Sequence, residues 1–158
     1  MGAERFLRGS QRADGRWEGS WGVCFTYGTW FGVSGLRACG ARDRDAALGR
    51  ARAFLAARQR ADGSWGEAPA SCWGRRYVEH PEGQAVMTAR ALLALLRAGH
   101  DDEDAMARAA RFLVDRVGDD GTWPRESIAG VFNRTCMINY DNYRKYSPLW
   151  ALAEWRGR

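Results

Sequence analysis

Hydrophobic side chains recur at three- and four-residue spacing in two stretches of the chain. The positions in each stretch share one helical face: they are Leu48, Ala51, Phe54 and Leu55 in the first, and Met106, Ala109, Leu113 and Val117 in the second. This spacing predicts two amphipathic helices, each with its opposite face open to solvent. The acidic run at residues 101–104 is expected to be the charged and capped N-terminus of the second helix.

A third stretch, Val86 to Leu96, is apolar around nearly its whole circumference and is followed by Gly99. This pattern predicts a buried helix. Phe25 to Cys39, rich in aromatic residues and glycine, and Ile138 to Trp155, interrupted at Pro148, are also expected to form buried or cavity-facing helices. No strand pattern competes. The chain is therefore predicted to be all-α, an array of helical hairpins that closes into a toroid or stacks into a solenoid.

An internal repeat follows the predicted outer helices. Its three copies run near residues 6–17, 54–65 and 112–123, and each begins with Phe-Leu and ends with Asp-Gly-x-Trp. Successive copies begin 48 and 58 residues apart, about the length of two helices and their connections. Each Asp-Gly is expected to stop its helix, and each Trp to lie back over the Gln amide as a structural clamp. The residues of this clamp are Gln11 and Trp17, Gln59 and Trp65, and Trp123, where Val117 replaces the Gln.

Charge and cysteine content narrow the functional classes. The net charge is +5, and Lys145 is the only lysine among 24 basic residues. The arginines are spread along the chain between acidic residues, which argues against a nucleic-acid-binding stripe. The four cysteines are widely separated and have no histidine partners, so no metal or other cofactor is expected. Cys24 and Cys136 are expected to be buried, inert fillers.

The motif Q-x-x-D-G-x-W resembles the QW repeat of the triterpene cyclases, which that family carries on an α/α barrel. The repeat alone leaves the squalene–hopene and oxidosqualene branches open. The stretches DGRWEGSWGVCFTYGTWFG (residues 14–32) and DGTWPRESIAGVFN (residues 120–133) resemble the oxidosqualene branch, of the lanosterol and cycloartenol synthase type. The resemblance continues to the end of the chain through Tyr140, Tyr143, Arg144, Pro148 and Trp150.

This resemblance implies that residues 1–158 are the C-terminal part of an α/α barrel, and thus an incomplete barrel. Oxidosqualene cyclases are several times longer and have two such domains. Their epoxide-protonating acid lies in an upstream Asp-Cys-Thr-Ala-Glu motif, which this sequence does not contain. The acidic run at 101–104 does not match the D-x-D-D motif of squalene–hopene cyclases, because its third residue is Glu103. No catalytic acid is therefore expected within this chain, and its activity in isolation stays open.

The resemblance also implies a substrate, partners and site residues. The substrate would be 2,3-oxidosqualene or a similar linear triterpene, cyclised through carbocations to a polycyclic triterpenol. Trp21 and Phe132 match cavity aromatics that stabilise these cations, Ile138 and Tyr140 shape the same wall, and Asn133 and Thr135 line the entry channel. The N-terminal remainder of a cyclase would be the protein partner. The family is monotopic, which implies a peripheral membrane contact on the cytoplasmic side, although no amphipathic stretch stands out as the patch.

Two other functional classes remain. The chain could be a catalytically incomplete or degenerate toroid that acts only as a structural or lipid-binding module. It could instead be a separate prenyl-binding toroid such as a protein prenyltransferase β-subunit, but that family's zinc site cannot be assembled from His80, His100 and four scattered cysteines. An isolated barrel portion is expected to expose inner helices such as Val86 to Leu96 and to self-associate.

Overall fold

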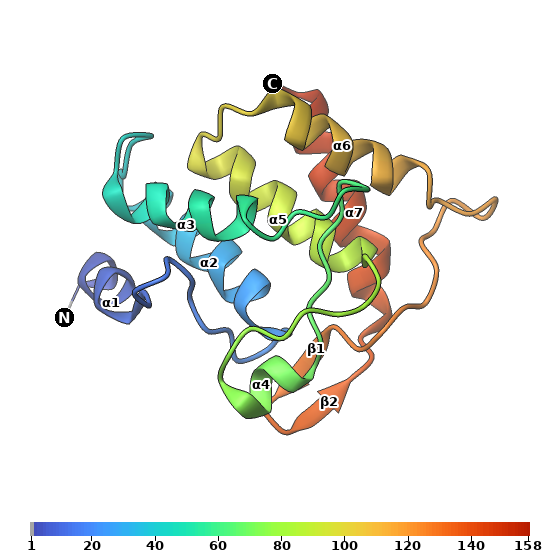
Figure 1. Ribbon diagram of the computed structural model, residues 1–158, viewed down its shortest axis with the longest axis horizontal. Helices are drawn as coiled ribbons and strands as arrows, with labels where there is room; N and C mark the ends of the chain where they lie inside the picture. Colours follow the sequence, from blue (N-terminus) through green and yellow to red (C-terminus); the bar gives the residue numbers. More distant parts are fainter. Residues whose placement is uncertain (1) are drawn as a thin grey trace.

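The computed structural model describes residues 2–158 and consists of three helical hairpins with a small β-hairpin (Figure 1). The outer helices are α1 (Ala3–Ser10), α3 (Ala46–Ala56) and α6 (Glu103–Val114). Each leads through one copy of the repeat toward an inner helix: α2 (Cys24–Ala38), α5 (Ala85–Ala98) and α7 (Asp141–Arg156). A short helix, α4 (Ala70–Gly74), precedes α5. The prediction of a helical, incomplete α/α toroid is confirmed.

Helix α5 forms the centre of the molecule. It packs against α2 and α3 on one side and against α6 and α7 on the other (Figure 1). All but two of its side chains are buried, which confirms the prediction of a buried helix. The expectation that this helix is exposed in the isolated chain is wrong, because its neighbours within the same chain already cover it. Large exposed apolar side chains lie instead on the flanking inner helices: Phe31 on α2, and Tyr146, Leu149 and Trp150 on α7.

The region after the third repeat differs from the prediction. Gly130–Phe132 (β1) pairs antiparallel with Cys136–Ile138 (β2), so Ile138 lies in a strand and the last helix begins at Asp141. Each strand has only three residues, too few for an alternating pattern to be visible in the sequence. Pro148 does not interrupt α7, although a proline has no backbone N–H to donate to the preceding turn. Val117 lies beyond α6 and is exposed.

The repeat holds each outer helix to its following turn through hydrogen bonds. The indole N–H of Trp17, Trp65 and Trp123 donates to the carbonyl of Leu7, Leu55 and Leu113, respectively, at 2.7, 2.9 and 2.8 Å. The amide of Gln59 donates both to Gly63 O within its own turn (3.0 Å) and to Ala105 O in α6 (2.7 Å). Gln11 makes the equivalent pair of bonds with Gly15 O and with Ala47 O in α3. Each Gln therefore joins its turn to the next outer helix.

A glycine is required in the first two of these turns. Gly15 and Gly63 have φ angles of 94° and 85°. A Cβ at Gly63 would lie 2.6 Å from the carbonyl oxygen of Arg108, and a Cβ at Gly15 would overlap that of Arg50. A side chain would therefore both strain the backbone and push the next outer helix away.

Carboxyl groups from later parts of the chain cap two inner helices. Both oxygens of Glu67 accept hydrogen bonds at the N-terminus of α2, from the backbone N–H of Phe25 (2.9 Å) and Thr26 (2.8 Å). Glu126 accepts from the N–H of Ala85, the first residue of α5, at 2.6 Å. Neither helix has a side-chain hydrogen bond from its own N-cap residue. The N-termini of α2 and α5 therefore depend on the segments that follow the second and third repeats.

Candidate functional site

A hollow of about 370 Å³ lies between the start of α2, the β-hairpin and α7. Its lining is mostly aromatic: Trp21, Tyr27, Gly130, Val131, Ile138, Tyr140, Tyr143 and Tyr146. The segment that carries Trp21 is fixed to the hairpin by backbone bonds, because Val131 N–H donates to Trp21 O at 3.1 Å and Val23 N–H donates to Ala129 O at 3.1 Å. The structure therefore brings together three of the residues expected in the cavity wall, Trp21, Ile138 and Tyr140.

Phe132 lies beside this hollow. Its ring contacts that of Trp21, with centroids 5.0 Å apart and planes inclined by 48°. Both rings are open to solvent in this chain: Trp21 is 57% exposed and Phe132 41% exposed. The two aromatics expected to stabilise cations thus form one pair, with faces available to a ligand or to a covering protein segment.

Asn133 and Thr135 lie at the tip of the hairpin and line neither this hollow nor the larger one described next. Asn133 and Arg134 both have positive φ, at 48° and 66°, which makes the tight turn between β1 and β2. Thr135 donates only to the carbonyl of Asn133, within the turn. Both residues are exposed; Asn133 follows Phe132 directly, and Thr135 directly precedes β2. Their assignment to a channel stays a prediction.

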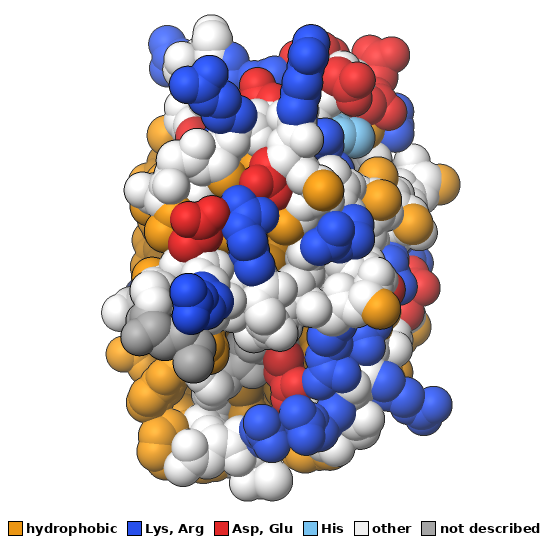
Figure 2. Space-filling view, turned by 90° about the vertical axis from the view of Figure 1, so that its left-hand side faces the viewer, with side chains coloured by type: hydrophobic (Ala, Val, Ile, Leu, Met, Phe, Trp, Pro, Cys, Tyr) orange, Lys and Arg blue, Asp and Glu red, His pale blue; other side chains and the backbone are white. Residues whose placement is uncertain are grey.

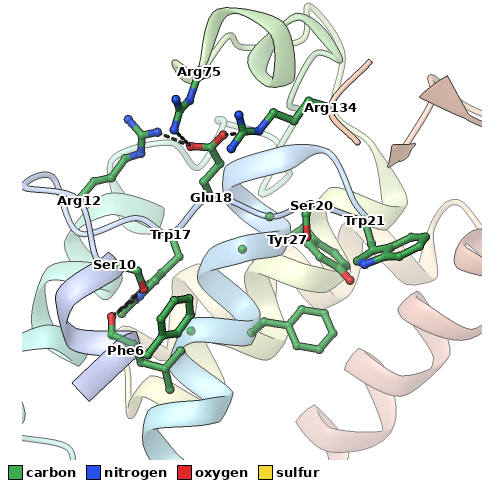
Figure 3. Close-up of a pocket in the computed structure, with 15 residues that line it drawn as sticks. Phe6, Ser10, Arg12, Trp17, Glu18, Ser20, Trp21, Tyr27, Arg75 and Arg134 are labelled. Carbon is green, nitrogen blue, oxygen red and sulfur yellow. Dashed lines mark hydrogen bonds and ion pairs between the residues drawn. The ribbon is translucent and has the colours of Figure 1, made fainter. Parts of the chain in front are cut away.

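A larger hollow of about 630 Å³ shares Trp21 and Tyr27 with the first and extends toward α1 (Figure 3). Phe6, Trp17 and Phe31 form its apolar part. At its other side, three arginines from separate segments converge on Glu18, as Figure 3 shows. Arg12 is paired with Glu18, and Arg75 and Arg134 approach its carboxyl at 3.3 and 3.5 Å.

Positive side chains outnumber negative ones around Glu18 in this larger hollow. Burial raises the pKa of the Glu18 carboxyl, but hydrogen bonds from Arg12 and Arg75 outweigh this effect and hold the pKa below its usual value. Glu18 is therefore ionised at neutral pH and balances only one of the three arginines. Elsewhere on the α1 side of the molecule, basic and acidic side chains are interspersed, and hydrophobic side chains gather along one margin (Figure 2).

Arg90 was not found by sequence reasoning. It lies on α5, is 1% exposed, and its guanidinium carbon is 4.9 Å from the ring centroid of Tyr27 and 4.5 Å from that of Tyr143. Burial lowers the pKa of Arg90. Burial also raises the pKa of Tyr27 and that of Tyr146. The only sequence signal for Arg90 was a lone arginine within the otherwise apolar stretch from Val86 to Leu96.

The cysteines are only partly as expected. Cys24 is buried, but Cys136 is exposed because it lies in β2 at the edge of the hairpin and not in a helix. A hydrogen bond with Cys72 and burial raise the pKa of the Cys24 thiol, which keeps it protonated and unreactive. Within residues 2–158, no cluster of three His, Cys, Asp or Glu side chains could hold a metal ion. No helix in the same range is long and apolar enough to cross a membrane.

The aromatic hollow offers ring faces and an apolar surface. Aromatic faces attract a cation without forming a bond to it, and this attraction is worth about 2 kcal/mol or more where water is excluded. The hollow can therefore hold an apolar chain and stabilise a developing positive charge. None of its lining residues is a carboxylic acid that could start such a reaction by protonation.

Comparison with known proteins gives a consistent result. Residues 2–157 match the family model described as the squalene-hopene cyclase C-terminal domain. The chain is 48% identical over 152 residues to human lanosterol synthase and 48% identical over 151 residues to cycloartenol synthase from Dictyostelium discoideum. These alignments cover 94% and 96% of this chain but only 21% and 22% of the relatives. The chain thus spans about a fifth of the length of the curated relatives it matches.

Solved structures show the same fold. The type II terpene cyclase MstE from Scytonema superposes with a TM-score of 0.77 at 20% identity, over 95% of this chain and 47% of that one. The ent-copalyl diphosphate synthase from Streptomyces platensis superposes with a TM-score of 0.70 at 23% identity, over 97% of this chain and 27% of that one. At these identities the comparison supports the helical toroid and nothing finer.

Proposed function

Because this chain belongs to the squalene–hopene cyclase C-terminal domain family, we propose that it forms part of the cavity wall of a triterpene cyclase that converts 2,3-oxidosqualene to a polycyclic triterpenol. The observation that carries the proposal is the aromatic hollow. Trp21, Ile138 and Tyr140 line it together, and Phe132 packs on Trp21 at its edge. These four residues come from segments more than 100 positions apart in the sequence, and the fold brings them together.

In the proposed reaction, an acid protonates the epoxide oxygen, the epoxide C–O bond breaks, and the chain of double bonds closes through successive carbocations. The last carbocation loses a proton, which leaves a neutral triterpenol with a hydroxyl group from the epoxide. A further cyclase portion supplies that acid, because the hollow has no carboxyl group in its lining. Trp21 and Phe132 present ring faces to the cationic centres, and Ile138 and Tyr140 fix the shape in which the substrate folds. Such preorganised groups are most effective when water is excluded, so the further portion must also cover the open side of the hollow.

The hairpin tip and the route by which substrate arrives complete the proposal. Asn133 and Thr135 would lie where substrate passes toward the wall, as polar side chains next to Phe132. A triterpene is insoluble in water, so it would reach the site from a lipid bilayer, and a peripheral membrane contact on the cytoplasmic side is part of the proposal.

A second candidate is a structural or lipid-binding module without turnover. It is favoured by the openness of the site, since Trp21 and Phe132 are both exposed in this chain. In that case the hollow would bind a linear isoprenoid without changing it.

The deciding experiment supplies what the chain lacks. The chain is co-expressed with the four-fifths of human lanosterol synthase that it does not match, and the purified mixture is incubated with 2,3-oxidosqualene and assayed by mass spectrometry. Triterpenol formed only in the presence of both parts would support the cyclase proposal. Substrate bound but unchanged would support the module, and triterpenol from the chain alone would contradict the proposed origin of the acid.

A matched pair of variants tests the wall itself. We expect Phe132→Ala to lower triterpenol yield about tenfold or to change the product mixture, because a ring face next to Trp21 is lost. Trp73→Ala is the control, since Trp73 is also an exposed aromatic residue but lines neither hollow. Equal yields from both variants would show that Phe132 has no part in the reaction.

A further inference from the structure

Arg90 is a buried cation next to two residues of the aromatic hollow. Its guanidinium carbon lies over the rings of Tyr27 and Tyr143, at 4.9 and 4.5 Å from their centroids, and both tyrosines line the hollow. It makes no ion pair within residues 2–158, and its one hydrogen bond is from Nη1 to Ala129 O at 3.2 Å. Its Nε and Nη2 atoms are buried without a hydrogen-bond acceptor in the same range. The charge is therefore neutralised by no neighbouring carboxylate.

Glu67 is a buried carboxyl group whose charge favours the charged form of Arg90, but its oxygens are engaged elsewhere. Both oxygens of Glu67 accept from the backbone at the N-terminus of α2. A guanidinium stays protonated even where burial disfavours its charge. Arg90 consequently contributes a full positive charge to a region of low dielectric, where electrostatic effects are strong.

The charge of Arg90 weakens the attraction of the two tyrosine rings for a cation in the hollow. Each ring gives one face to the guanidinium, and the attraction draws electron density toward that face. The attraction of each ring for a second cation in the hollow is weakened accordingly. Direct repulsion between two positive charges adds to this effect. Within residues 2–158 no arginine lies over the ring of Trp21 or of Phe132, so this pair keeps its full attraction for a cation.

Resting on the proposed function, we propose that Arg90 is a specificity-determining residue that makes the Tyr27–Tyr143 end of the hollow unfavourable for a carbocation and confines the charge to the Trp21–Phe132 end. The length of the charge migration, and with it the product, would depend on this one side chain. Arg90 would act without touching substrate, because it is not among the residues that line the hollow.

The test measures the binding of two probes of equal shape to the full chain by calorimetry. One probe is the hexyltrimethylammonium ion, and the other is its neutral isostere, in which a tert-butyl group replaces the trimethylammonium group. We expect Arg90→Met to raise the affinity for the ammonium probe about tenfold or more relative to the neutral probe, because a repelling charge is removed. Arg90→Gln is a second neutral variant, to be used if Arg90→Met does not fold.

Two controls separate charge from packing. Arg90→Lys keeps a positive charge only where the pH is low enough to protonate a buried lysine, so its probe ratio should approach that of the unaltered chain as the pH falls and that of Arg90→Met as the pH rises. Arg97→Met removes an arginine two turns further along α5 that is paired with Glu154 at 2.9 Å, and it should leave the ratio unchanged. An unchanged ratio in Arg90→Met, equal ratios in the Met and Lys variants at every pH, or failure of the ammonium probe to bind the Met variant would each overturn the inference.

The same variants, co-expressed with the remaining cyclase portion, report on product. We expect Arg90→Met to shift the triterpenol mixture, while Arg97→Met does not. If the unaltered chain yields no triterpenol with its complement, the proposed function fails, and the probe ratio still decides the electrostatic role of Arg90.

Discussion

Replacing Glu67 with glutamine should strongly destabilise the chain, although the two side chains have nearly the same shape. Glu67 is fully buried, and its two oxygens accept hydrogen bonds from the N–H groups of Phe25 and Thr26 in the first turn of α2. In Glu67→Gln one oxygen becomes an NH₂ group, which meets a backbone donor and leaves it without an acceptor. The charge that interacts favourably with the helix N-terminus is also lost.

The cost follows from these two effects. A lost charge-assisted hydrogen bond in a buried position is worth about 1.5–3 kcal/mol, and the helix-dipole interaction about 0.3–1 kcal/mol. We therefore expect the free energy of unfolding to fall by about 2–4 kcal/mol. For a chain of this size, that corresponds to a decrease in Tm of about 5–15 °C.

Thermal and urea unfolding followed by circular dichroism would measure the change. Glu79→Gln is the matched control, because Glu79 pairs with Glu67 across an isolated backbone bridge but points into solvent, with an exposed ion pair to Arg60. Its loss should cost less than about 1 kcal/mol. A Glu67→Gln variant as stable as the control would refute the assignment of Glu67 as the cap of α2.

Three further predictions concern the clamp, the charges and the surface. Trp65→Phe should cost about 2–4 kcal/mol of stability in urea unfolding, because it removes the indole hydrogen bond to Leu55 O and creates a cavity. A cost under about 1 kcal/mol would show that the indole bond is dispensable. Folding lowers the pKa of Glu18, so its ion pairs stabilise the chain at pH values above the unfolded pKa of about 4.5. In thermal melts, the stability advantage over Glu18→Gln should be lost as the pH falls from that value through the lower pKa of the folded state, and a difference that stays constant with pH would contradict this. Leu149→Arg on α7 should reduce self-association in sedimentation velocity, whereas Val114→Arg on α6 should not.

The helices that could be predicted from the sequence are those with a clear pattern of apolar residues. The burial of α5 could be read from its nearly uninterrupted apolar run, and the repeat turns from Asp-Gly-x-Trp. The β-hairpin could not be predicted, because three-residue strands have no measurable period, and its turn is made by Asn133 and Arg134 without a glycine. Pro148 was misleading, since a single missing hydrogen bond is tolerated in a helix that is held by packing.

The site was predictable only in part. Trp21, Ile138 and Tyr140 could be named from the resemblance, but their meeting in one hollow depends on tertiary structure. Glu67 and Arg90 escaped notice because a lone acid or arginine in a sequence gives no sign of whether it is buried or what surrounds it. Their roles come from partners about 40 or more residues away.

The carboxyl caps also set an order in time. As the chain leaves the ribosome, α2 emerges complete but lacks an acceptor for its first N–H groups until Glu67, 42 residues beyond Phe25, has been made. Helix α5 waits in the same way for Glu126, 41 residues beyond Ala85. Helices α2 and α5 are thus completed only after the following repeat turn has been synthesised. The hairpins should assemble in steps from the N-terminal side during translation, and a pause placed between either helix and its cap should lengthen the time that helix spends without its cap.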